Sequence, residues 1–186
     1  FGPITRARVS AAGGATGTTP PIVGVPAGTD LVVSAASDSP ASRTIGSGTA
    51  FNVAAKFALT AGSKSVSISS ITFQKSGFVT NTNLNGIDVV DSKGVRHGQV
   101  VSSVNADNSI TIVMTSDPIV VAAGSTEYIT VRFNLLSGDY TGTVSFGINA
   151  VSAISANTSA ISGAFPLSGV AMNIVKNVVS NTLIAE

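Results

Sequence analysis

The single histidine, His97, is the side chain best suited to proton transfer near neutral pH. It follows Arg96 in a segment between Asp91 and Gln99 that reads as a hairpin. A general base needs a nucleophile and an orienting carboxylate beside it, and the neighbours in sequence supply neither with any specificity. We therefore predict an exposed turn histidine. No tight acidic pair indicates a glycosidase-type site, so the sequence predicts a protein that is not an enzyme and has no catalytic residue and no cofactor.

A second candidate for chemistry is the segment 81–88, NTNLNGID, which alternates oxygen-bearing side chains with a central glycine, as a calcium loop does. Its first position is Asn rather than Asp, and its twelfth, Ser92, is not the bidentate Glu. These two losses of negative charge weaken binding, and an ordinary Asn-rich turn is the alternative. The candidate ligands are Asn81, Asn83, Asn85 and Asp88; no other metal site is predicted.

The triplet Asn157-Thr158-Ser159 is a formal acceptor for N-glycosylation in a Ser/Thr-rich stretch that we expect to be exposed. A glycan on Asn157 requires a source organism that modifies exported asparagines.

Composition excludes several classes of partner. Only 10% of the 186 residues are charged and the net charge is +1, so no basic stripe is present to track nucleic acid. No apolar run approaches the roughly 18 residues that span a bilayer. Cysteine and tryptophan are absent and tyrosine occurs twice, which removes thiolate metal sites and argues against an aromatic platform for sugars. Ser, Thr, Asn and Gly fill the polar positions, a composition typical of extracellular structural proteins.

Alternation of apolar and polar residues with a period of two predicts strands throughout residues 30–186. A bulge near Ser69 and Ser70 is expected, because Val66 and Ile68 lie on one phase and the apolar residues from Ile71 lie on the other. The sequence predicts an all-β, antiparallel β-sandwich, immunoglobulin-like or jelly-roll-like, with about nine to eleven strands. One predicted core-facing set is Phe51, Val53, Ala55, Phe57 and Leu59.

The first 29 residues belong to no obvious part of this domain. Residues 10–29 are rich in Gly, Thr and Pro, so residues 1–29 are predicted to be an extended segment or linker. Sheet edges invite an added strand, and a chain with few charges has limited means to block them. The segment is therefore a candidate donor strand for a neighbouring copy, and a strand that folds back on its own sheet is the alternative. Residues 176–186 are the competing donor or a C-terminal extension. The candidate inserting side chains are Ile4, Ala7 and Val9.

Two short motifs, KFALTA at 56–61 and FPLSG at 165–169, look like the Ser/Thr/Ala/Val-rich β domains of predicted surface proteins in uncultured bacteria. The low-charge sandwich with a detached N-terminal segment also resembles bacterial and archaeal filament subunits that assemble by donor-strand complementation. The resemblance covers roughly residues 31–175. It implies a pilus-like or biofilm-matrix role and supplies no catalytic residues.

The resulting prediction is a structural, homopolymeric filament subunit at the cell surface, exported with removal of a signal peptide, since Phe1 is what such cleavage would leave. The alternative is a β-sandwich binding or stalk module of a larger adhesin or surface protein, recognising carbohydrate or another protein. Assembly state separates the two.

Overall fold

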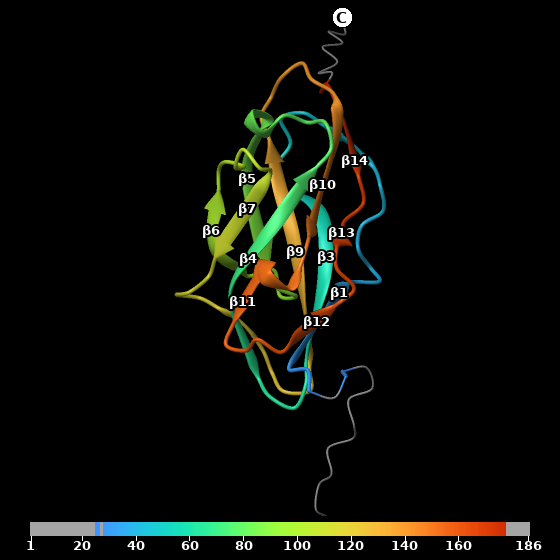
Figure 1. Ribbon diagram of the computed structural model, residues 1–186. Helices are drawn as coiled ribbons and strands as arrows, with labels where there is room; N and C mark the ends of the chain where they lie inside the picture. Colours follow the sequence, from blue (N-terminus) through green and yellow to red (C-terminus); the bar gives the residue numbers. More distant parts are fainter. Residues whose placement is uncertain (1–24, 27, 178–186) are drawn as a thin grey trace, which may run out of the picture.

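A computed structural model describes residues 25–26 and 28–177, which form two curled β-sheets packed face to face (Figure 1). The predicted all-β, sandwich-like class is confirmed. Helix is limited in this part of the chain to two short 3-10 segments, η1 (Asn81–Asn83) and η2 (Val151–Ala153). Neither these nor any other described helix is long and apolar enough to cross a membrane.

The first sheet has six strands in the order β12-β1-β3-β9-β5-β6. All of its ladders are antiparallel except that of β1 with β12, which is parallel. The strands are β1 (Leu31–Ala35), β3 (Asn52–Ala61), β5 (Leu84–Val90), β6 (Arg96–Val101), β9 (Thr126–Leu135) and β12 (Ile161–Gly163).

The second sheet is organised around β4 (Val66–Ser76), which pairs with four other strands at successive positions along its length. At one edge β2 runs parallel to β14, so the sheets are mixed rather than purely antiparallel. The described residues form fourteen strands, more than predicted, because several have only two or three residues. The others are β2 (Thr44–Gly46), β7 (Ser109–Val113), β8 (Ile119–Val121), β10 (Gly142–Ile148), β11 (Ile154–Ala156), β13 (Leu167–Ser168) and β14 (Met172–Val175).

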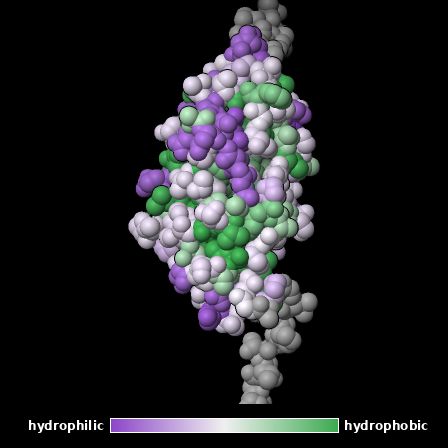
Figure 2. All heavy atoms as spheres, in the orientation of Figure 1, coloured by the Kyte–Doolittle hydropathy of each residue, from purple (hydrophilic) through white to green (hydrophobic). Residues whose placement is uncertain are grey.

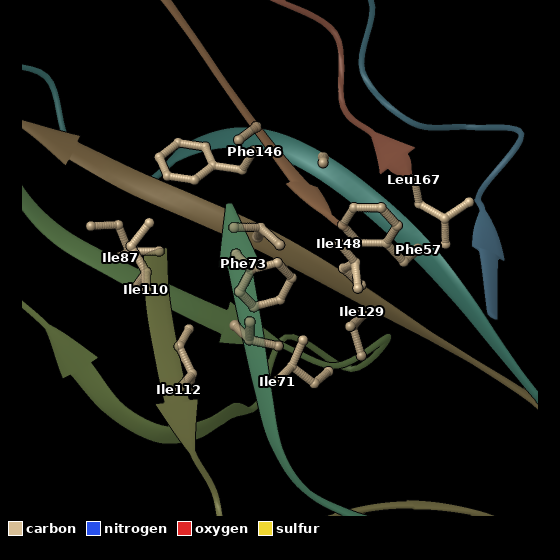
Figure 3. Close-up of a cluster of buried hydrophobic side chains, with 14 of the residues drawn as sticks. Phe57, Ile71, Phe73, Ile87, Ile110, Ile112, Ile129, Phe146, Ile148 and Leu167 are labelled. Carbon is tan, nitrogen blue, oxygen red and sulfur yellow. The ribbon is translucent and has the colours of Figure 1, made fainter. Parts of the chain in front are cut away.

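Two aromatic pairs join the sheets across the core, and Figure 3 labels Phe57 and Phe73 of the first pair. Phe57 on β3 stacks on Phe73 of β4 with ring centroids 6.2 Å apart. Phe133 on β9 meets Phe146 on β10 at 5.6 Å. All four side chains are almost wholly buried, and each contributes about 1.5–3 kcal/mol through removal of apolar surface from water.

The bulge predicted in β4 is confirmed. Ile71 faces Ile154 and Ser70 faces Ser155, but the next partner of β11 is Ile68, so Ser69 is the extra residue. Because one residue is inserted, the apolar side chains before and after it all face the core.

The predicted inward set at the start of β3 is only partly correct. Phe57 and Leu59 are buried, as is Ala55, but Phe51 is 61% exposed. The β3–β9 register shifts between Val53 and Ala55, which breaks the alternation that the sequence pattern assumed. Phe51 also has a φ of 55°, so it lies outside the extended backbone of the strand.

Candidate functional site

The two ends of the described chain lie at opposite poles of the sandwich (Figure 1). At the N-terminal pole, Val25 lies beside Gly62, whose carbonyl accepts a hydrogen bond from the amide of Gly124. At the C-terminal pole, the amide of Asn177 donates to Ser47 Oγ at 3.2 Å, and that hydroxyl donates to the carbonyl of Gly138. A chain continuing beyond either end therefore leaves from a different pole.

Three large apolar side chains are exposed around the C-terminal pole. Phe51 precedes β3, Phe78 follows β4 and is 86% exposed, and Leu136 follows β9. The amide of Gly48 donates to the carbonyl of Leu136, which links Leu136 to the turn at residues 47–48. The same turn binds Asn177 through the hydroxyl of Ser47. These exposed apolar side chains make the C-terminal pole a candidate contact surface.

A groove of about 290 Å³ opens at the same pole. It lies where β5 and β6 separate, because the ladder between them ends at the pair Ile87 and Val101. Apolar side chains of Leu84 and Leu136 contribute to its walls. The remaining lining residues are Asn81, Thr82, Asn85, Ser102, Ser103 and Val104.

The segment 102–104 forms one wall of this groove and continues from β6, the edge strand of the first sheet. Among the hydrogen bonds of turns and loops in the described residues, none involves the backbone of 102–104. Ser102 and Ser103 are exposed, so this segment is a candidate for pairing with an added strand.

The groove is held open by amide contacts. Asn81 Nδ2 donates to the carbonyl of Asn105 at 3.1 Å and to Asn108 Oδ1 at 3.0 Å, which fixes the turn after residues 102–104 against η1. The amide of Leu136 donates to the carbonyl of Asn83, which fixes the other wall. Figure 2 shows a band of hydrophilic side chains on the upper half of one face, with hydrophobic side chains gathered lower down.

The candidate calcium ligands are distributed between two environments. Asn81 and Asn85 both line the groove, and Asn83 bonds Leu136 through its backbone. Asp88 accepts two hydrogen bonds from Arg132 instead, at 2.9 and 2.5 Å. Within the described residues, no group of three His, Cys, Asp or Glu side chains is placed to hold a metal ion.

His97 is not the exposed turn residue that the sequence predicted: it lies on β6 and only 9% of it is exposed. Its Nε2 lies 3.5 Å from Asp91 Oδ2 and its Nδ1 lies 3.0 Å from the carbonyl of Asp117. These two contacts join the β5–β6 turn to the loop between β7 and β8. Burial alone would raise the pKa of Asp91, but hydrogen bonds from Val95, His97 and Lys93 lower it overall.

The remaining predicted sites are at the surface or outside the described residues. Asn157 is exposed, and its side-chain oxygen accepts a hydrogen bond from the amide of Ser67, so its glycosylation stays a prediction. The candidate donor residues Ile4, Ala7 and Val9 lie outside the described residues, as does most of 176–186.

Sequence reasoning missed the groove and a buried lysine. The fold brings residues 102–104 and Leu136 together, and no local sequence pattern predicts that they line a groove. Lys75 is 5% exposed, and burial lowers the pKa of its amine. Its position after Ile71 and Phe73 on the inward phase of β4 was a signal that could have found it.

No family model and no curated protein matches the chain. One solved structure similar to it is described as a family 123 glycoside hydrolase from Clostridium perfringens, in work on glycolipid glycan hydrolysis. The TM-score is 0.37 and the identity is 11%. The match covers 81% of this chain and 28% of that one, so this chain spans well under a third of the length of that structure.

Proposed function

We propose that this protein is a structural subunit of an extracellular filament or pilus, polymerising head to tail by inserting a terminal strand into the sheet of a neighbouring copy. The observation that carries the proposal is the position of the chain ends at opposite poles. A segment leaving one pole can reach the far pole of another copy, and a head-to-tail contact that does not close produces a filament.

The sheets support this proposal through their edges. The first sheet ends in β12 and β6, and the second has β2 at one edge, so in the described residues both sheets have edge strands. A chain with only 10% charged residues has few charges with which to protect such edges. Pairing with another chain satisfies their backbone groups.

The same opposite placement of the ends favours a second candidate, a stalk or binding module in a larger surface protein. Tandem domains connected at opposite poles also form an extended rod. This candidate needs no strand exchange, so its domain remains monomeric when isolated.

Electron microscopy of the native protein beside a variant lacking residues 1–12 tests the proposal. Filaments that disappear on truncation, while circular dichroism shows the domain still folded, support donation by the N-terminal segment. Filaments that persist transfer the donor role to residues 176–186. A monodisperse native monomer contradicts polymerisation and favours the stalk module.

A further inference from the structure

We propose that the groove at the C-terminal pole is the acceptor site for residues 1–24 of a second copy of this chain. The inference rests on the proposed head-to-tail assembly and adds the surface on which it occurs. The proposed contact lies in the gap between the start of β5 and residues 102–104.

The backbone around the groove offers an unfilled position in a sheet. The β5–β6 ladder stops at Ile87 and Val101, and the strands separate beyond that pair. Residues 102–104 continue along one wall without turn or loop hydrogen bonds among the described residues. An extended segment entering the gap can pair with this wall, as in strand addition to a sheet edge.

The origin of the segment favours an occupant from another copy over a segment that folds back along its own domain. Residue 25 lies at the N-terminal pole, whereas the groove is at the opposite pole beside Leu136. Fully extended, residues 1–24 reach roughly 80 Å, enough to cross from one subunit into the next. When subunits stack pole to pole, the segment of one copy faces the groove of the next.

The chemistry of the groove matches this segment. Its volume of about 290 Å³ is at the lower limit of ligand-pocket sizes and suits small side chains such as Ala7 and Val9. Its lining residues carry no charge, and residues 1–24 contain no acidic residue that would have to be desolvated there.

One carboxylate near the groove matches the charge of the segment. Asp107 is exposed in the turn that Asn81 fixes through Asn105 and Asn108. No ion pair involves Asp107 within residues 25–26 and 28–177. The cations of the segment, Arg6 and Arg8, are thus complementary to the acid beside the groove.

Disulfide trapping tests the contact directly, because the chain contains no cysteine. The double variant Val9→Cys/Ser103→Cys places one thiol in the segment and one on the exposed groove wall. The matched control, Val9→Cys/Ser125→Cys, places the second thiol on an exposed turn at the N-terminal pole. Both proteins are oxidised mildly and run on non-reducing gels.

We expect a ladder of cross-linked oligomers from the Ser103 variant, forming about ten-fold faster than from the Ser125 control, because docking raises the local thiol concentration. A fast-migrating cross-linked monomer means that the segment occupies its own groove, which overturns the proposal. Filaments in the microscope without a ladder from the Ser103 variant would rule out the groove as the acceptor site, but the proposed filament function would stand. Absence of both filaments and ladder overturns the proposed function as well.

The charge match has its own test. Asp107→Asn keeps the shape of the turn and removes the complementary charge, so the rate of ladder formation should fall about two- to five-fold at low salt and change little at high salt. Asp139→Asn, at the same pole but paired with Lys176, is the control. Equal rates for the two variants would mean that Asp107 does not contact the segment.

Discussion

Arg132 on β9 holds the carboxylate of Asp88 on β5 with two hydrogen bonds, from Nε to Oδ1 at 2.9 Å and from Nη2 to Oδ2 at 2.5 Å. The Asp88 side chain is only 5% exposed, and the ring of Phe51 lies 5.1 Å from the Arg132 guanidinium carbon. The three groups link β5, β9 and the start of β3 near the C-terminal pole. Because the Asp88 carboxylate is buried, removal of Arg132 would leave a buried charge without a partner and destabilise the fold.

Arg132→Met should lower the free energy of unfolding by about 2–3 kcal/mol, because it leaves the Asp88 carboxylate buried without its partner. The double variant Asp88→Asn/Arg132→Met should recover more than half of that loss, since no charge is then buried. Urea denaturation measures both. A single variant as stable as the native protein would show that the pair contributes nothing.

Asp91 should contribute to the acid sensitivity of the domain. Its pKa is lowered overall, so its stabilising contribution is present above the ordinary carboxyl pKa and is lost as pH falls through the folded-state pKa. Asp91→Asn should therefore lower the melting temperature near neutral pH, and the difference should shrink towards about pH 2. Exposed Asp139, changed to Asn, should give little difference at any pH; a constant deficit for Asp91→Asn contradicts the linkage.

Lys75→Met should stabilise the domain by about 1 kcal/mol at neutral pH, because the buried amine loses hydration. Within the described residues, the amine makes one hydrogen bond, a long one of 3.5 Å to the Gly77 carbonyl. Its lowered pKa means that the unfolded chain binds more protons, so native stability rises as pH increases towards the ordinary lysine value. The variant should lack that rise. Lys64→Met, at a side chain that is 74% exposed, is the matched control for thermal unfolding.

Gly77→Ala should be far more damaging than Gly94→Ala. Both glycines have positive φ, 97° and 79°, so each substitution costs about 1 kcal/mol in backbone strain. At Gly77 the added Cβ would also clash with the carbonyl oxygen of Thr143, whereas at Gly94 no atom lies within 4 Å of an added Cβ. We expect Gly77→Ala to lower the free energy of unfolding by about 3 kcal/mol or more, measured by urea denaturation. Similar losses at both positions would mean that backbone strain alone accounts for the destabilisation.

The strand pattern predicted the sheets because burial on one face imposes a period of two, and even the extra residue at Ser69 was visible in the sequence. The same reasoning placed Phe51 in the core and was wrong there, because the register shift before Ala55 depends on pairing with β9. The parallel edges formed by β12 and β2 could not be predicted either, since strand order depends on contacts between segments far apart in the chain.

The candidate site was less accessible to sequence reasoning. His97 is polar and follows a turn, so it was expected in solvent, yet the fold places Asp91 and Asp117 on either side of it. The groove combines Asn81, Leu136 and residues 102–104, which share no local motif. Such sites become visible only when distant turns are brought to one pole.

The position of Val25 and Asn177 at opposite poles also determines how the domain carries mechanical load. β1 runs away from the N-terminal pole, and β14 runs towards the C-terminal pole. Tension between the two ends therefore acts along these strands, so the ladder hydrogen bonds of β1 and β14 are sheared together instead of being opened one at a time. The domain therefore resists stretching between its two ends through its backbone ladders.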